Sequence, residues 1–176
     1  MSIIERRTRE TEITVRFERE GAATADTGVR FLDHMMVTLG RYSGSGLVVA
    51  ARGDLRHHVI EDVAIAVGLA AAERAEGPIA RYGHAVIPMD DAVVEAVLDL
   101  GGRPYYRGGL PSDLYEHWMR SFADNARATL HLFVRRGRDR HHIVEAAFKA
   151  LGVALRQALE PAAAVYSTKG AVQVKR

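Results

Sequence analysis

The sequence carries an internal repeat that restricts the chain to a duplicated architecture. Residues 52–61 and 136–145 both read R-G-x-x-R-H-H-φ-φ-E, where φ is a β-branched apolar residue. After each copy, apolar residues recur at spacings of three and four, which is the period of an amphipathic helix. The repeat therefore predicts two similar units, each with a helix that begins at a histidine pair. The apolar residues are Ile60, Ala64, Val67 and Ala71 in the first unit and Val144, Phe148, Leu151 and Leu155 in the second.

The similarity between the two halves continues upstream of the histidine pairs. In both halves a histidine, His34 or His117, stands after an acidic residue and before a bulky pair, in a segment typical of a short helix. The distance to the following histidine pair is 23 residues in the first half and 24 in the second. A strand-like run lies between them, residues 47–51 in one half and residues 129–134 in the other.

Two more strands and the ends of the two histidine helices can also be located. Residues 12–18 alternate strictly between apolar and polar, which indicates a half-buried strand. Residues 93–100 form a further candidate strand. The histidine helices are expected to end near Gly77 and Pro161, because glycine and proline are common stop signals.

These elements predict an α/β or α+β fold in which sheets are covered by helices. The two halves, about residues 1–88 and 89–176, are expected to be related by a pseudo-twofold axis. We find no linker that would separate the halves into independent domains. The chain is therefore predicted to be a single domain built of two repeats.

The composition excludes several kinds of site and partner. The chain has no cysteine but eight histidines, so disulfides, zinc fingers, iron–sulfur clusters and thiol nucleophiles are excluded. A net charge of +2 does not indicate nucleic-acid binding, and the longest apolar run, residues 63–72, is too short to cross a membrane. Charges occupy the N-terminal positions where a signal peptide would be apolar. We therefore expect a cytoplasmic protein without nucleic-acid or membrane partners.

The histidine pairs have the spacing of metal ligands. His57 and Glu61 lie four residues apart on one helix face, whereas His58 is rotated by about 100° from its neighbour. Each pair therefore offers ligands to two different ions. Imidazole and carboxylate ligands of this kind suit Mn²⁺, Fe²⁺ or Zn²⁺. The candidate ligands in the two halves are His34, His57, His58, Glu61, His117, His141, His142 and Glu145.

A single HHxxE motif would be a weak signal, because polar residues are common at the start of a helix. Here the motif occurs twice, and the polar residues of the two copies match better than the apolar ones. Packing alone would preserve the apolar face, so the pattern favours metal binding. His84 and His131 have no counterpart in the other half, and hydrogen-bonded structural roles are expected for both.

Further short motifs accompany these ligands along the chain. They are residues 7–11 (RTRET), 31–35 (FLDHM), 57–62 (HHVIED), 81–83 (RYG), 88–90 (PMD), 102–104 (GRP), 116–117 (EH), 129–131 (TLH), 141–150 (HHIVEAAFKA) and 167–170 (STKG). With them the chain closely resembles the imidazoleglycerol-phosphate dehydratase family over nearly its full length. The resemblance implies a hydro-lyase that removes water from imidazoleglycerol phosphate to give imidazole acetol phosphate in histidine biosynthesis. It also implies a fold of two duplicated units like the second domain of ribosomal protein S5.

The resemblance implies two Mn²⁺ ions per active site, held by the eight candidate ligands. Together with the helix geometry, it groups His57, Glu61, His117 and His142 around one ion, and His34, His58, His141 and Glu145 around the other. It further implies self-association into a shell of 24 subunits, with metal sites that are shared between subunits.

Catalytic and substrate-binding roles also follow from the resemblance. Glu10 is expected to contact the substrate and move its proton, and His34, Glu61 and Glu145 complete the catalytic set. Guanidinium, ammonium and hydroxyl groups suit the dianionic phosphate of the substrate. The matching residues are Arg81, Arg103, Lys149, Ser167, Thr168 and Lys169. Residues 166–170 are expected to form a loop that orders on substrate binding.

The chain departs from the family pattern in two places. The segment before His57 is about two residues shorter than the family's acidic D-D-H-H segment, and residues 41–44 read R-Y-S-G where the family has H-G-G-F. All eight ligands are present, so the changes concern the loop beside the first histidine pair. Two other functions stay open at this point. One is a dinuclear metal hydrolase acting on a phosphate ester, and the other is an assembly in which metals only join subunits.

Overall fold

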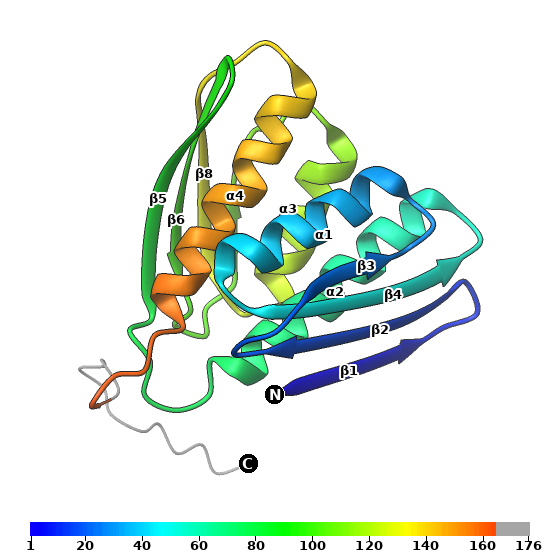
Figure 1. The fold of residues 1–176 in the computed structure, drawn as a ribbon, viewed down its shortest axis with the longest axis horizontal. Coiled ribbons are helices and arrows are strands. Elements are labelled where there is room, and N and C mark those ends of the chain that lie inside the picture. The colour runs from blue at the N-terminus through cyan, green and yellow to red at the C-terminus, as the bar shows by residue number, and fades with distance from the viewer. Residues whose placement is uncertain (165–176) are drawn as a thin grey trace.

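Each half of the chain folds into one four-stranded sheet and two helices in the same order (Figure 1). The computed structural model describes residues 1–164. The first half contains β1 Ser2–Arg7, β2 Thr11–Glu18, β3 Ala23–Asp26, α1 Arg30–Ser43, β4 Gly46–Gly53 and α2 Arg56–Arg74. The second half contains β5 Tyr82–Met89, β6 Ala92–Asp99, β7 Tyr105–Arg107, α3 Asp113–Asn125, β8 Thr129–Arg136 and α4 Arg140–Ala158.

The two sheets have the same topology. Their strand orders are β1-β2-β4-β3 and β5-β6-β8-β7, with antiparallel pairs except for the last. The last pair of each sheet, β3 with β4 and β7 with β8, is parallel, as a connection through a helix requires. The predicted α+β fold with an internal duplication is confirmed.

Most of the expected elements are present, with differences at their ends. The four predicted strands correspond to β2, β4, β6 and β8. The helices around His34 and His117 are longer than expected, with 14 and 13 residues. The histidine helices end at Arg74 and Ala158, a few residues before the glycine and proline signals. The second unit begins with β5 at Tyr82, so the structural division between the halves falls before the expected position near residue 88.

The four helices lie between the two sheets, and they join the halves (Figure 1). Helix α1 packs against α4, and α2 packs against α3, so both helix contacts cross from one half to the other. A single hydrophobic cluster contains buried residues from both halves. It includes the two apolar faces predicted from the repeat, whose eight residues are at most 2% exposed.

Two glycines at equivalent positions of the repeat allow these helices to approach closely. A Cβ atom on Gly68 of α2 would lie 2.7 Å from the Phe122 carbonyl oxygen in α3. A Cβ atom on Gly152 of α4 would lie 2.7 Å from the Cβ atom of Tyr42 and 3.1 Å from the Leu39 carbonyl oxygen in α1. Each glycine stands eleven residues after the first histidine of its pair. The missing side chains therefore set how near the histidine helices come to α1 and α3.

Within residues 1–164, every helix is too short or too polar to cross a membrane.

Candidate metal centre

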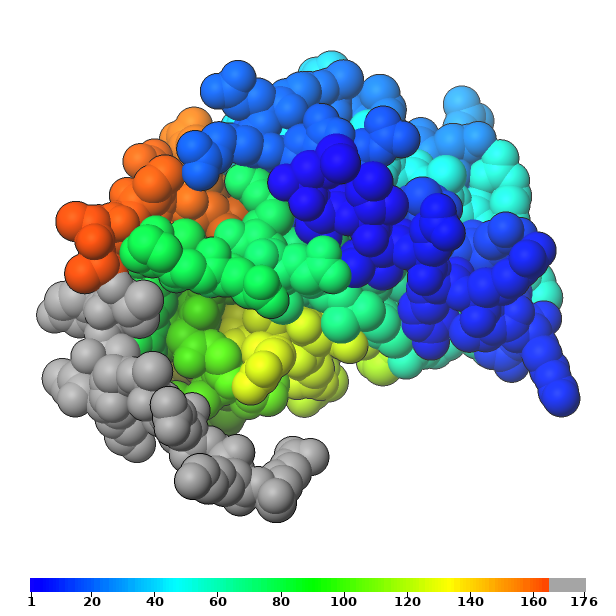
Figure 2. Space-filling view, turned by 90° about the horizontal axis from the view of Figure 1, so that it is seen from below, coloured from blue at the N-terminus to red at the C-terminus, as the bar shows by residue number. Residues whose placement is uncertain are grey.

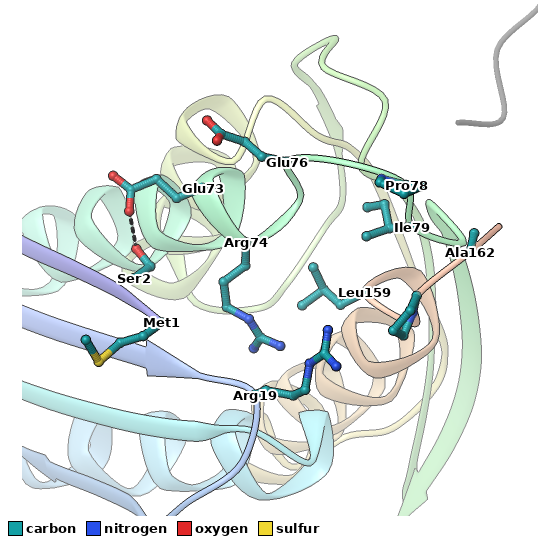
Figure 3. Close-up of a pocket in the computed structure, with 11 residues that line it drawn as sticks. Met1, Ser2, Arg19, Glu73, Arg74, Glu76, Pro78, Ile79, Leu159 and Ala162 are labelled. Carbon is teal, nitrogen blue, oxygen red and sulfur yellow. Dashed lines mark hydrogen bonds between the residues drawn. The ribbon is translucent and has the colours of Figure 1, made fainter. Parts of the chain in front are cut away.

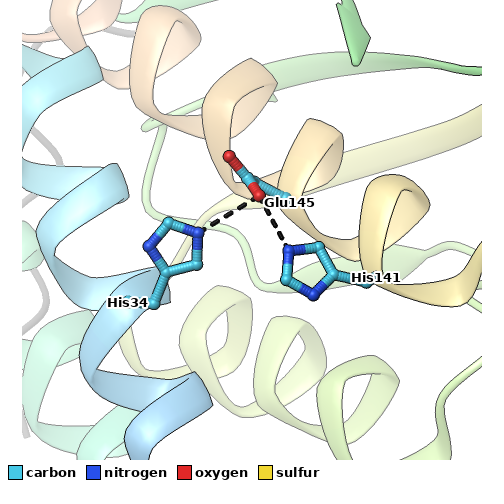
Figure 4. Close-up of side chains that lie close together, drawn as sticks. All are labelled: His34, His141 and Glu145. Atoms are coloured by element: carbon cyan, nitrogen blue, oxygen red, sulfur yellow. Dashed lines mark hydrogen bonds and ion pairs between the residues drawn. The ribbon is translucent and has the colours of Figure 1, made fainter. Parts of the chain in front are cut away.

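Two matched clusters of imidazole and carboxylate groups lie where the helices of the two halves meet. In the first, Nε2 of His34 and Nε2 of His141 each lie 3.1 Å from Oε2 of Glu145 (Figure 4). His34 is on α1, whereas His141 and Glu145 are one turn apart on α4. A single carboxylate oxygen thus faces two imidazole nitrogens, which is an arrangement that one cation can bridge.

The second cluster repeats this arrangement with the halves exchanged. Nε2 of His57 lies 3.6 Å from Oε2 of Glu61, and Nε2 of His117 lies 3.2 Å from Oε1 of the same residue. His57 and Glu61 belong to α2, and His117 belongs to α3. Each cluster therefore takes two ligands from a histidine helix of one half and one from a shorter helix of the other half. Each of these groups of three falls within one of the two sets of four ligands expected for the ions.

Glu145 is charged at neutral pH. Burial alone would raise the pKa of its carboxyl group, but hydrogen bonds from Lys149 and His34 lower this pKa to about 2. Nζ of Lys149 lies 2.9 Å from Oε1 of Glu145, which leaves Oε2 directed toward the two histidines. The buried carboxylate thus carries its negative charge to the place where the imidazole nitrogens converge.

One nitrogen in the second cluster lacks a hydrogen bond within residues 1–164. Nε2 of His117 is buried and makes none, although Oε1 of Glu61 is 3.2 Å away. A buried polar atom without a hydrogen bond is rare in folded proteins. The ring of His117 also stacks on His57 at 5.5 Å, which fixes its orientation. This nitrogen and the facing carboxylate fit a divalent cation between them.

The second histidine of each pair points elsewhere, as the rotation of 100° per residue requires. Nδ1 of His58 lies 2.8 Å from Oδ1 of Asp54 and 3.6 Å from Oε2 of Glu10. Nδ1 of His142 lies 2.7 Å from Oδ1 of Asp91. Within one chain the structure therefore brings together three of the four ligands expected for each ion. His142 does not join the cluster around Glu61, and His58 does not join the cluster around Glu145.

Asp54 and Asp91 are functional candidates that the sequence reasoning did not single out. Asp91, in the β5–β6 turn, accepts hydrogen bonds from the backbone of Arg138 and Asp139 just before α4. The hydrogen bond with His142 and these backbone bonds lower the pKa of Asp91 to about 2. The same hydrogen bond raises the pKa of His142, and Asp54 does likewise for His58. The spacing of four between Asp54 and His58 could have revealed that pair; the Asp91 contact depends on the fold.

Glu10 lies in the loop between β1 and β2, beside the first histidine pair. Its carboxylate is exposed, and with Asp54 and His58 it forms a third group of facing side chains. The backbone amide of Asp54 donates to the Glu10 carbonyl at 3.1 Å, which holds the two loops together. The structure therefore places Glu10 next to His58, a candidate metal ligand.

The expected phosphate-binding residues are spread along the part of the chain that follows α2. Lys149 lies beside Glu145 and is almost buried. Arg81 donates from Nε and Nη2 to Asp99 at 2.6 and 3.0 Å. Its φ of 74° is uncommon for a residue with a side chain. Arg103 is exposed in the turn after β6. Ser167, Thr168 and Lys169, together with the expected 166–170 loop, lie outside the described residues.

His84 and His131, the two histidines without a counterpart in the other half, differ in their contacts. Nε2 of His84 lies 3.0 Å from Oε1 of Glu95, so its expected hydrogen-bonded role is confirmed. His131 stacks on Phe133 with an angle of 10° between the rings. Within residues 1–164 the contacts of this histidine are with the rings of Tyr105 and Phe133, so its expected hydrogen-bonded role is not confirmed.

Comparison with known proteins agrees with the fold. The family model described as imidazoleglycerol-phosphate dehydratase matches residues 27–155. The imidazoleglycerol-phosphate dehydratase of Pyrobaculum calidifontis is 48% identical over 96% of this chain and 98% of its own length. That of Salinibacter ruber is 44% identical over 95% of this chain and 93% of its own length.

Two solved structures are also similar. The Pyrococcus furiosus enzyme has a TM-score of 0.89 and 37% identity, covering 96% of this chain and all of that one. The Staphylococcus aureus enzyme has a TM-score of 0.82 and 33% identity, covering 92% of this chain and all of that one. The family model, the relatives that align along nearly their whole length and the solved structures all agree. The chain belongs to the imidazoleglycerol-phosphate dehydratase family, whose members are hydro-lyases of histidine biosynthesis.

Proposed function

We propose that the two clusters each hold one Mn²⁺ ion and that the chain uses them to eliminate water from imidazoleglycerol phosphate. The observation that carries this proposal is the matched pair of clusters, each with two imidazole nitrogens around one glutamate carboxylate. The buried Nε2 of His117, which makes no hydrogen bond within residues 1–164, adds to it. Nitrogen and carboxylate ligands without sulfur suit manganese.

The clusters would supply the electrostatic part of the reaction. The proton to be removed is on a carbon with no neighbouring carbonyl, so the negative charge must be taken up by the imidazole ring of the substrate. When bound, the two ions would stabilise that charge as the C–H bond breaks. The side chains that would bind these ions include His34, Glu61 and Glu145. Lys149 keeps the Glu145 carboxylate ionised and oriented.

Glu10 would carry the proton. Elimination needs a base at carbon and an acid at the departing hydroxyl, and an exposed carboxylate on a loop can serve in both steps. Its Oε2 atom lies 3.6 Å from Nδ1 of His58, so the carboxylate stands at the edge of a metal-ligand group. Glu10 is therefore assigned the acid–base role, with His58 beside it.

The geometry of one chain supports a site shared between copies. His58 and His142 have no place in the clusters of their own chain and would complete the clusters of a second copy. The amide of Arg81 donates to the Ala158 carbonyl at one end of α4, whereas His141 lies in its first turn. A helix of this length separates them by about 25 Å. Arg81 and the cluster around Glu145 can act on one small substrate only if they come from different chains.

The outer face of the second sheet supports association of this kind. Large apolar side chains are exposed there, and exposed apolar patches are typical of contacts between proteins. They are Tyr82, Val86, Val97, Tyr105 and Phe133. The assembled state would be the 24-subunit shell that the resemblance implies. The phosphate of the substrate would be bound by Arg81, Arg103, Lys149, Ser167, Thr168 and Lys169.

The test is turnover by the full-length protein after its metal has been removed and Mn²⁺ restored. Formation of imidazole acetol phosphate by the Mn²⁺-loaded protein, and none after chelation, is expected. Release of inorganic phosphate instead would identify a hydrolase. An intact oligomer with bound Mn²⁺ and no turnover would mean that the metals only join subunits.

A further inference from the structure

A pocket outside the metal centre lies where the two halves meet at the far end of α2. Its volume is about 450 Å³. On the face shown in Figure 2, the N-terminal strand (dark blue), the segment after α2 (green) and the end of α4 (orange) come together around it. Helix α2 begins at the histidine pair and ends at Arg74, which places the pocket about 25 Å from the second cluster.

Two arginines from different elements face into this pocket (Figure 3). Arg74 is the last residue of α2, and Arg19 follows the end of β2. The Arg74 guanidinium lies 4.4 Å over the ring of Phe17, and its Nη1 atom donates to Oγ of Ser45 at 2.8 Å. These contacts fix the half-buried Arg74 and leave the rest of its guanidinium directed into the pocket.

The pocket brings the two positive charges together without a carboxylate between them. Within residues 1–164, neither arginine forms an ion pair with an acidic side chain. Glu73 accepts a hydrogen bond from the Ser2 hydroxyl and points away from the guanidinium groups, as does Glu76 (Figure 3). Burial and the charge of Arg19 both lower the pKa of Arg74, which is the effect of a cation that lacks a counter-ion.

One side of the pocket wall is apolar. Leu159 lies at the end of α4, and Pro78 and Ile79 lie in the connection to β5. A pocket of this volume admits a molecule larger than a simple ion. Paired guanidinium groups match the oxygens of a phosphate group, and the apolar side of the pocket matches a short carbon skeleton.

We propose that this pocket is a second ligand site, which binds a small phosphorylated metabolite with its phosphate between Arg19 and Arg74. The site is separate from the metal centre, and residues at the ends of α2 and α4 line it. A ligand there would bridge the two halves and stabilise the folded chain by mass action.

The test uses the Mn²⁺-loaded full-length protein and inorganic phosphate as the probe. Phosphate binding is measured by calorimetry for the wild type, Arg19→Gln, Arg74→Gln and the exposed control Arg16→Gln. Any phosphate bound at the metal centre is common to all four proteins. Loss of one charged hydrogen-bonding partner is expected to weaken the pocket's affinity roughly tenfold in Arg19→Gln and Arg74→Gln but not in Arg16→Gln.

Because Arg74 also packs on Phe17, a second variant separates ligand binding from folding. Arg19→Glu places a carboxylate beside Arg74, so it should abolish binding in the pocket and raise the melting temperature without phosphate. A crystal soaked with selenate, an anomalously scattering analogue, should show a peak between the two guanidinium groups. Equal phosphate affinity in all four proteins would overturn the proposal. So would a carboxylate from residues 165–176 or from another subunit between the arginines.

Discussion

His34 and Glu145 belong to different halves of the chain, yet Nε2 of His34 lies 3.1 Å from Oε2 of Glu145. The exchanged contact, between His117 of the second half and Glu61 of the first, measures 3.2 Å. Neither half could therefore form a cluster alone. The duplication produces a site only because α1 packs on α4 and α2 packs on α3.

Gly68→Ala and Gly152→Ala test whether these crossings set the site. Alanine normally favours a helix over glycine by about 1 kcal/mol, so a neutral position would gain stability. Here the added Cβ atoms would meet the facing helices at 2.7 Å. We expect each change to cost about 1–3 kcal/mol of unfolding free energy, measured by urea denaturation, and to weaken metal binding.

Gly109→Ala is the matched control, since a Cβ atom at Gly109 would meet nothing within 4 Å. This variant should keep the stability and the metal affinity of the wild type. If Gly68→Ala and Gly152→Ala behave like Gly109→Ala, the helices can move apart to accommodate a Cβ atom. Their close approach would then not determine the geometry of the clusters.

Much of this arrangement could be predicted from the repeat, because the repeat shows both the helical spacing of the apolar residues and the positions of the histidines and glutamates. The spacing of four predicts that His57 faces Glu61, and the rotation per residue predicts that His58 turns away. The sequence pattern does not locate β1, β3, β5 and β7. β3 and β7 have only four and three residues and little alternation, and β5 contains a glycine and a proline. The contacts between halves, and the bond between Asp91 and His142, depend on packing that no local pattern encodes.

Glu61→Gln and Glu145→Gln test the clusters separately. Each change keeps the size of the side chain but removes the negative charge between two imidazole nitrogens. We expect each variant to lose most of its activity and to bind fewer Mn²⁺ ions, as measured by metal analysis after dialysis. Glu160→Gln, at an exposed position after α4, is the control and should bind metal like the wild type. Full metal content in both cluster variants would contradict the assignment of these glutamates as ligands.

Tyr106→Phe tests how α3 is held in front of the second cluster. The Tyr106 hydroxyl donates to Oε2 of Glu116 at 2.7 Å, and the Leu110 amide donates to the same oxygen at 2.9 Å. Burial and this hydrogen bond both raise the pKa of Tyr106, so the hydroxyl stays protonated. Removing a hydrogen bond to a charged group should cost about 1.5–3 kcal/mol in thermal or urea unfolding.

The neighbouring Tyr105 is exposed and gives the control variant Tyr105→Phe, which should leave the unfolding free energy within about 0.5 kcal/mol of the wild type. Because Glu116 precedes His117, Tyr106→Phe should also weaken Mn²⁺ binding at the second cluster more than at the first. Equal stability of the two tyrosine variants would show that solvent replaces the lost hydrogen bond.

Metal removal tests whether the clusters are completed by another chain. His58 and His142 lie outside the clusters of their own chain, so an ion that recruits them from a second copy links two chains. Chelation should therefore lower the assembly size as well as the activity, and Mn²⁺ should restore both, as followed by light scattering after size-exclusion chromatography. His58→Asn and His142→Asn should resemble the chelated protein. His84→Asn is the control and should assemble normally, because in the described part of the chain the His84 side chain is paired only with Glu95. A chelated protein that keeps its full assembly size would mean that contacts such as the exposed face of the second sheet hold the copies together without metal.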